Sequence, residues 1–404
     1  AAQSIEGRVA AAPDGIVRMS YATRAGVCGD ARDAVAMGKA LYIWPSMESH
    51  GTWSGVRCVA GPARVEFTKR GREITSARTR VGGTWSSTDE RVTDLGVVPA
   101  REAGAYMVSL AGIVEATRPA REMLLAAAIA DSGDVAPAMW KLARDAGRPR
   151  ETRRRAIFWY GTLGDAGAAS NLSAMAQDAN EDRGTREAAI GALSQMADNA
   201  GVTALISIAN KSDDVTLRGK AAFWLGQSDD PRGRTTLRAM ITSDDTPDKV
   251  KEEAIFALGQ NDPPPEDVQF LERAYKGFTS EKLKEKVFFS IAQTKDDRGM
   301  RWLLDVGRDA KESVQARNQA LFWAGQSGVS LADLTKTYDA IDERRVKEHL
   351  IFVLSQRSEP EAVDKLMAIA RTDADREMRK KALFWLGQKN DPRVTKMLTD
   401  MISR

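Results

Sequence analysis

The sequence predicts a mainly α-helical protein: an α-α solenoid of about nine stacked helix pairs over residues 96–404, preceded by a small β-rich domain over residues 1–95. The first observation behind this prediction is a seven-residue phrase that recurs along the chain, as in AAFWLGQ at 221–227 and ALFWLGQ at 382–388. The second is its regular spacing, since a period of about 33 residues is typical of stacked repeats. The third is that the phrase is absent before residue 96. Copies begin at residues 123, 156, 189, 221, 254, 287, 320, 350 and 382.

Each unit is predicted to contain two helices. We number the first residue of the phrase 0 and call the helix that carries it the phrase helix. Apolar residues stand at −4, 0, +1, +3 and +4, and most of these positions share one helical face at about 100° per residue. Gly at +5 and Gln at +6 predict the end of the helix. A second amphipathic run follows, and neither helix can bury its stripe alone, so the units are expected to stack.

A cation stands at position −3 in eight copies: Arg153, Arg186, Arg218, Lys251, Lys284, Arg317, Lys347 and Arg379. This position lies inside the apolar face, so the stem of the side chain must be partly covered. Three aspartates, Asp182, Asp214 and Asp375, each precede one of these cations by four residues. The pattern predicts a ladder of Arg–Asp contacts that ties neighbouring units together. A cationic stripe that binds a ligand is the alternative.

The repeat resembles the HEAT family, in particular the short HEAT-like repeats of bilin lyases. The resemblance rests on Val, Leu or Met at −4, the cation at −3, the small residue at 0 and Leu-Gly at +4 and +5, and it covers about residues 97 to 404. It implies a solenoid that serves as an interaction scaffold, because a fold of this kind does not by itself specify a function. The lyase connection rests on repeat architecture alone.

The chain departs from the family pattern by placing aromatic residues at +2 and +3. Trp at +3 belongs to the apolar stripe and is predicted to pack in the core. Phe at +2 points away from that stripe, so it either fills gaps between units or forms an apolar row on the inner curve that binds a partner. We predict Phe256, Phe289, Phe322 and Phe352 as the anchors of that partner surface. The +2 residues are Phe158, Phe223, Phe256, Phe289, Phe322, Phe352 and Phe384, and the +3 tryptophans are Trp159, Trp224, Trp323 and Trp385.

Residues 1–95 read as β-rich. Alternation predicts a strand over 16–23, a short apolar run covers 40–44, and 64–80 is typical of a hairpin that turns at Lys69–Arg72. Cys28 and Cys58, the only cysteines, both lie here. A pair confined to one small domain predicts a disulfide. Two free thiols and a metal site with His50 are the alternatives.

Several features favour a location outside the cytoplasm, either periplasmic or secreted. The chain begins Ala1-Ala2-Gln3, as a mature end left by a signal peptidase would, although a truncated chain would look the same. The predicted disulfide fits an oxidising compartment. No apolar stretch approaches the roughly 20 residues that cross a bilayer.

Charge is nearly balanced, with 59 Lys and Arg against 56 Asp and Glu. Basic residues nevertheless cluster twice, and each cluster is either solvated surface or a contact for an acidic partner or lipid headgroups. A solenoid without net charge argues against nucleic acid. The clusters are Arg64, Lys69, Arg70, Arg72, Arg78 and Arg80 in the hairpin, and Arg148, Arg150, Arg153, Arg154 and Arg155 in the solenoid.

The sequence contains no recognisable catalytic, cofactor-binding or metal-binding motif. Its two histidines, His50 and His349, are far apart, and neither a Gly-rich phosphate loop nor a Gly-x-Ser-x-Gly elbow is present. We therefore predict a non-enzymatic, extracytoplasmic scaffold that binds another protein. In its narrower form this is a peripheral subunit on the periplasmic face of a respiratory or photosynthetic membrane complex. The alternative is a lyase-like or chaperone protein that acts on a cofactor-bearing client.

Overall fold

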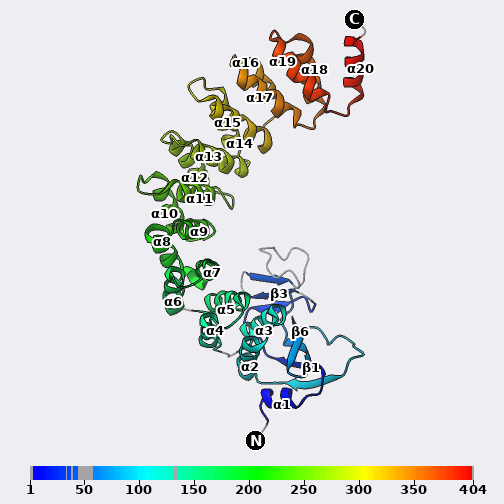
Figure 1. Ribbon diagram of the computed structural model, residues 1–404, viewed down its shortest axis with the longest axis vertical. Helices are drawn as coiled ribbons and strands as arrows, with labels where there is room; N and C mark the ends of the chain where they lie inside the picture. The colour runs from blue at the N-terminus through cyan, green and yellow to red at the C-terminus, as the bar shows by residue number, and fades with distance from the viewer. Residues whose placement is uncertain are drawn as a thin grey trace. The chain divides into compact units, whose positions relative to one another are not determined.

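The computed structural model describes residues 3–32, 34–37, 40–43, 58–131, 134–164 and 166–402 of the 404-residue chain (Figure 1). Trp44 and His50 lie outside the described residues. The chain divides into two compact units, Ala1–Ile208 and Ala209–Arg404. Helices in repeated pairs make up most of the second unit and a large part of the first, which confirms the predicted fold class. The first unit combines the β-rich segment with the first helix pairs, so the domain boundary at residue 95 stays a prediction.

A four-stranded sheet forms the larger part of the β-rich segment, in the order β6-β5-β1-β7. The predicted hairpin is present, and β1 pairs antiparallel with β5 and parallel with β7. Alternation along β5 buries Ala63, Val65 and Phe67 on one face. The hydroxyl of Tyr21 donates to the carbonyl of Ala126 at 2.8 Å, which joins the sheet to the first repeat. The strands are β1 (Gly15–Tyr21), β5 (Ala63–Arg70), β6 (Glu73–Val81) and β7 (Val92–Val97).

A second, three-stranded sheet consists of β2 (Val27–Gly29), β3 (Ala34–Met37) and β4 (Ala40–Ile43). Cys28 on β2 is bonded to Cys58, with Cα atoms 5.3 Å apart, so the predicted disulfide is present. Both cysteines pack against buried Ala34 and Ala36. The bridge therefore ties the start of the hairpin segment to this small sheet.

Helices account for the rest of each unit. In the first unit they are α1 (Ile5–Ala11), α2 (Ala100–Ile113), α3 (Thr117–Ile129), α4 (Ala136–Arg144), α5 (Arg150–Leu163), α6 (Ala166–Gln177), α7 (Arg183–Ser194), the 3₁₀ turn η1 (Ala197–Asn199) and the start of α8 (Val202–Lys211). In the second they are α9 (Val215–Gly226), α10 (Pro231–Thr242), α11 (Asp248–Leu258), α12 (Pro265–Tyr275), α13 (Glu281–Thr294), α14 (Asp297–Arg308), α15 (Val314–Ser327), α16 (Leu331–Ala340), α17 (Arg344–Ser355), α18 (Pro360–Thr372), α19 (Arg376–Leu386) and α20 (Pro392–Ile402). The odd-numbered helices from α3 to α19 are the phrase helices.

The phrase supplies the core, as α9 illustrates. Leu217, Ala221, Ala222 and Leu225, at −4, 0, +1 and +4, are all fully buried. Gly226 at +5 has a role that the sequence did not reveal. A Cβ atom there would lie 2.6 Å from the carbonyl oxygen of Ala257 on α11, so glycine allows two successive phrase helices to approach closely.

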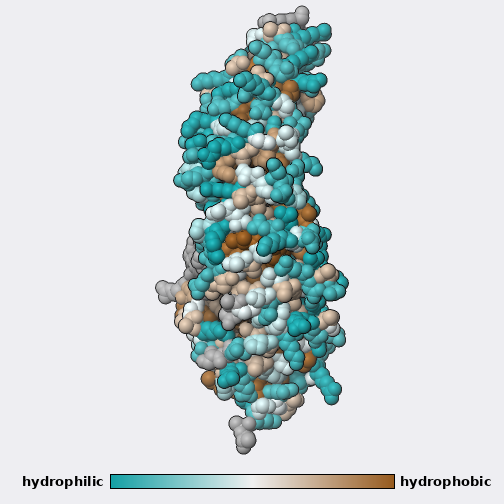
Figure 2. Space-filling view, turned by 90° about the vertical axis from the view of Figure 1, so that its left-hand side faces the viewer, coloured by the Kyte–Doolittle hydropathy of each residue, from teal (hydrophilic) through white to brown (hydrophobic). Residues whose placement is uncertain are grey.

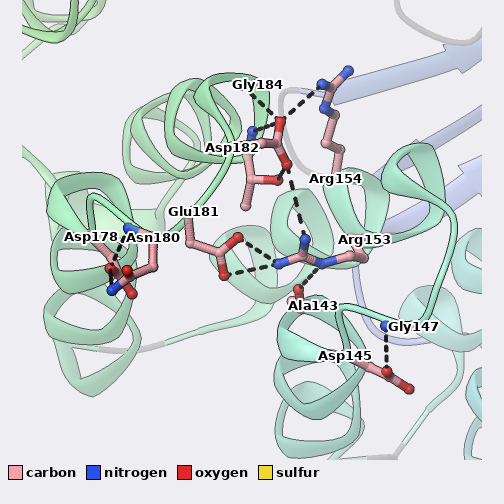
Figure 3. Close-up of polar contacts among 11 residues, drawn as sticks. Ala143, Asp145, Gly147, Arg153, Arg154, Asp178, Asn180, Glu181, Asp182 and Gly184 are labelled. Atoms are coloured by element: carbon pink, nitrogen blue, oxygen red, sulfur yellow. Dashed lines mark hydrogen bonds and ion pairs between the residues drawn. The ribbon is translucent and has the colours of Figure 1, made fainter.

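The cations at −3 bind mainly to backbone carbonyls, and their contacts with aspartate are secondary. Nε of Arg153 donates to the carbonyl of Ala143 at 2.8 Å, and Nη2 donates to both carboxylate oxygens of Glu181 (Figure 3). Nη1 of Arg153 also lies 4.0 Å from a carboxylate oxygen of Asp182 in the next repeat, so this contact of the predicted Arg–Asp ladder is present, and Asp182 caps α7 as well by accepting from backbone N–H groups. A cation at −3 reaches the unpaired carbonyls that end the preceding helix, which favours this arrangement. The same contact joins Arg186 to Ala176, Arg218 to Ala209 and Arg317 to Gly307.

Candidate functional site

The clearest surface feature of the second unit is a row of aromatic side chains on its phrase helices, which we call the aromatic ladder. It begins with Phe223 and Trp224 on α9 and continues through the +2 phenylalanines of α11, α13, α15, α17 and α19, together with the +3 tryptophans of α15 and α19. The +2 rings lie off the buried stripe, so they remain partly exposed. Phe384, near the C-terminal end of the ladder, is the most exposed, at 58%. The ladder consists of Phe223, Trp224, Phe256, Phe289, Phe322, Trp323, Phe352, Phe384 and Trp385.

Each ring of the ladder contacts the next. Phe256 stacks on Phe223 and on Phe289, with ring centroids 6.3 and 6.0 Å apart. Phe289 meets Trp323 edge-on at 5.0 Å, and Phe322 stacks on Phe352 at 6.4 Å. These are offset or edge-to-face arrangements, which aromatic pairs prefer.

The last steps complete the row. Phe352 contacts Trp385 with ring centroids 5.2 Å apart, and Trp385 contacts Phe384 at the same distance. The aromatic surface is therefore continuous from α9 to α19.

The tryptophans at +3 divide into two groups. Trp159 in the first unit is fully buried, as predicted. Trp224, Trp323 and Trp385 are partly exposed and belong to the ladder, so the core prediction is wrong for these three. Position +3 lies at the edge of the apolar stripe, only one residue from the exposed +2 position, and neighbouring helices decide whether the ring is covered.

Polar side chains accompany the ladder. The ammonium group of Lys286 lies 5.8 Å from the ring centroid of Phe256 and 5.7 Å from that of Phe289. A cation over a ring face at this distance is attracted by the ring's quadrupole. The glutamines at +6 follow four residues after each Phe, at or near the end of the phrase helix. These are Gln227, Gln260, Gln293, Gln326, Gln356 and Gln388.

Successive phrase helices of the second unit pack more tightly against one another than the alternate helices do. Contacts between α9 and α11, or α15 and α17, are far more extensive than those between α10 and α12 or α14 and α16. Figure 2 shows the side of the second unit on which α10 lies, where hydrophilic residues predominate and hydrophobic residues form small separate patches. The ladder thus lies on the more tightly packed layer of helices.

A groove of about 480 Å³ opens on the ladder where α13, α15 and α17 meet. Phe322 and Trp323 provide its aromatic walls, and His349 faces it from α17. Asn318, Gln319 and Glu285 contribute polar groups. Phe322 was predicted from the sequence as an anchor, whereas His349, Asn318 and Gln319 were not predicted to have a role. Their positions at −2 and −1 of the phrase, beside the +2 ring, were the available signal.

Burial shapes the chemistry of His349. Loss of water contact lowers the pKa of its imidazole, while a hydrogen bond to the backbone carbonyl of Asn318 opposes that shift. The ring is therefore neutral at pH 7. Its Nε2 atom is buried and has no hydrogen-bond partner, so Nδ1 is the donor to Asn318.

The structure does not gather the six basic residues of the hairpin into one exposed patch. Arg80 is buried and paired with Glu66, and Arg64 lies over Trp85 with its guanidinium carbon 5.9 Å from the ring centroid. Lys69 donates to the carbonyl of Ala12 at 2.6 Å. Arg70 and Arg72 are exposed at the turn, and Arg78 is partly buried.

In the second cluster, Arg148 pairs with Asp145 at 2.9 Å, and Arg150 is exposed at the start of α5. Arg153 is buried and bonded to Glu181. Within the two predicted clusters, the cations exposed to solvent therefore include Arg70, Arg72 and Arg150.

Comparison with known proteins concerns the repeats first. A family model described as HEAT repeats matches residues 136–218 and 202–292. Together with the stacked helix pairs, this match supports a HEAT-repeat family for that part of the chain. The more specific likeness to bilin lyases finds no support in this match, and no curated protein matches the chain.

The chain is similar to several solved structures at low sequence identity. Human deoxyhypusine hydroxylase in complex with glycerol is 18% identical, over 58% of this chain and 89% of its own, with a TM-score of 0.29. Lipovitellin is 12% identical, over 90% of this chain and 43% of its own, with a TM-score of 0.49. Kap95p bound to RanGDP is 13% identical, over 75% of this chain and 51% of its own, with a TM-score of 0.34.

Among the described residues, no group of three or more His, Cys, Asp and Glu side chains is arranged to hold a metal ion. Within the same residues, no helix is both long and apolar enough to cross a membrane.

Proposed function

We propose that this HEAT-repeat protein is a non-enzymatic scaffold that binds another protein through the aromatic ladder. The observation that carries the proposal is that the ladder is continuous and partly exposed over six successive phrase helices. Contiguous apolar surface on a soluble protein commonly marks an interaction site. Aromatic side chains also supply much of the binding energy at protein interfaces.

The packing of the second unit supports the ladder as the inner surface of the solenoid. In a curved array the helices of the inner layer are closer together than those of the outer layer, and the phrase helices are the closer set. Solenoids use their concave surfaces to bind extended partners. Phe256, Phe289, Phe322 and Phe352 are the anchors in this proposal.

We further propose that the protein works outside the cytoplasm, in the periplasm or after secretion. The disulfide between Cys28 and Cys58 supports this location, since such bridges persist in oxidising compartments. A narrower version places the scaffold on the outer face of a membrane complex. There, exposed Arg70, Arg72 and Arg150 offer cations to lipid headgroups, each worth about 1 kcal/mol near an anionic surface.

Site-specific photocrosslinking in the source organism tests the partner surface. A benzophenone side chain would replace Phe289 or Phe322 on the ladder, and Phe270 on α12 in the matched control. We expect the same protein adduct from both ladder positions and none from position 270. Adducts of equal yield from all three positions, or none from the ladder, would contradict the proposal.

A further inference from the structure

The groove beside Phe322 contains hydrogen-bond acceptors that the protein itself does not satisfy. Nε2 of His349, Oε1 of Gln319 and Oδ1 of Asn318 are buried without a hydrogen-bond partner, and all three residues line the groove. A buried polar atom without a partner costs about 1–3 kcal/mol. Three such atoms around one groove indicate a place where a ligand completes the hydrogen bonds.

The hydrogen bonds of the neighbouring atoms show that at least two of the three groups are acceptors. Because Nδ1 of His349 donates to the carbonyl of Asn318 and the ring is neutral, Nε2 carries a lone pair. Nε2 of Gln319 donates to a carboxylate oxygen of Glu285 at 3.0 Å, so the remaining amide atom is the carbonyl oxygen. These acceptors therefore lie just beneath the wall of the groove, and the Glu285 residue lines the groove beside them.

The walls of the groove favour a flat cation. Phe322 and Trp323 meet edge-on with centroids 5.1 Å apart, which leaves aromatic faces for stacking. The nearby Lys286 already lies over two ladder rings, so this surface accommodates cations. Arg345 also lines the groove and opposes a second cation, but its side chain is exposed and therefore screened by solvent.

We propose that this groove binds the guanidinium group of an arginine side chain presented by the partner protein. Guanidinium has five N–H donors and no acceptor, is planar, and stacks on aromatic rings, which matches unsatisfied acceptors between aromatic walls. The groove volume of about 480 Å³ lies within the range of roughly 300–1,000 Å³ for small-ligand sites. This inference rests on the proposed function and specifies which partner residue the ladder recognises.

Short peptides provide the direct test. The probes are acetyl-Gly-Arg-Gly-amide, the same peptide with citrulline, which has the shape of arginine without its charge, and the same peptide with aspartate. The readout is the ¹⁵N shift of His349 in the histidine-labelled full chain, assigned against a His50→Gln variant. We expect a saturable shift of the Nε2 signal with the arginine peptide and affinity at least about tenfold weaker with citrulline.

Three outcomes would overturn the inference. The first two are equal binding of the citrulline peptide and tighter binding of the aspartate peptide. The third is the absence of a saturable shift up to the solubility limit of the arginine peptide. Photocrosslinks from position 289 alongside such a result would leave the partner surface intact and refute the arginine site alone. Saturable arginine binding without ladder crosslinks would instead support the arginine site and refute the partner surface.

Matched variants locate the binding. Glu285→Gln and Gln319→Leu should each weaken the arginine peptide about tenfold, since each removes a charged or hydrogen-bonding partner. Glu253→Gln is the control, because residue 253 is exposed and occupies on α11 the repeat position that Gln319 occupies on α15. Circular dichroism of each variant checks the fold. If Gln319→Leu unfolds, Glu285→Gln still decides the question, and unchanged affinity in that variant would refute the site.

Discussion

Two adjacent phenylalanines on α13 allow the ladder to be separated from the core by stability measurements. Phe288 is fully buried and lies between Tyr275 and Trp302, with ring centroids 5.2 and 5.8 Å away. Phe289 is partly exposed and contacts Phe256 and Trp323. Replacing each in turn by Ser removes the same atoms from the same helix. The difference between the two losses in free energy of unfolding therefore reports on burial.

The expected costs differ for a physical reason. Truncating a buried Phe costs about 3–5 kcal/mol, and the buried hydroxyl of Ser adds to this in Phe288→Ser. Phe289→Ser should cost only about 1–3 kcal/mol, since it removes two aromatic contacts worth about 0.5–1.5 kcal/mol each.

Urea denaturation followed by circular dichroism measures both variants against the wild type. Because a repeat array can unfold in more than one step, midpoints should be compared for the same transition. The ladder interpretation requires Phe289→Ser to lower the midpoint clearly less than Phe288→Ser does, while crosslinking from position 322 to the partner is lost. If Phe289→Ser costs as much as Phe288→Ser, the ladder is packing and the proposed surface is refuted.

Three further predictions concern structure elsewhere in the chain. Gly226→Ala should destabilise the second unit by about 1–3 kcal/mol through its clash with Ala257, and an unchanged melting temperature would contradict the close-approach argument. Burial raises the pKa of Glu122 from 4.5 to about 7, so the folded state holds the proton more tightly and stability falls as pH rises between these values. Glu122→Gln should remove that fall in stability, which is worth roughly 3 kcal/mol at pH 8. If the stability of the variant and of the wild type changes with pH in parallel, the prediction is wrong. Reducing Cys28–Cys58 should cost about 2–4 kcal/mol in the first unit and spare the second, as thermal melts with intact-mass analysis would show.

Local patterns were enough to predict most of the helices and one hairpin. The phrase predicts the buried residues at −4, 0 and +4 of α9 and α19, because residues on one helical face are set by sequence spacing alone. The β5–β6 hairpin is equally local, since a short turn joins its strands. In contrast, β7 was missed because its pairing is with β1, more than seventy residues earlier, and its own sequence hardly alternates.

The candidate site shows the same division. Sequence spacing by itself determined that Phe256, Phe289 and Phe322 leave the core stripe, because position +2 is set by the helical period. Tertiary packing alone decided that Trp323 joins them, since exposure at the edge of a stripe depends on how closely the next helix lies. The groove is likewise assembled from α13, α15 and α17. Glu285, Gln319 and His349 therefore line it together only after three repeats stack. A period can place a side chain on a face of its own helix, but the partners across that face come from other helices.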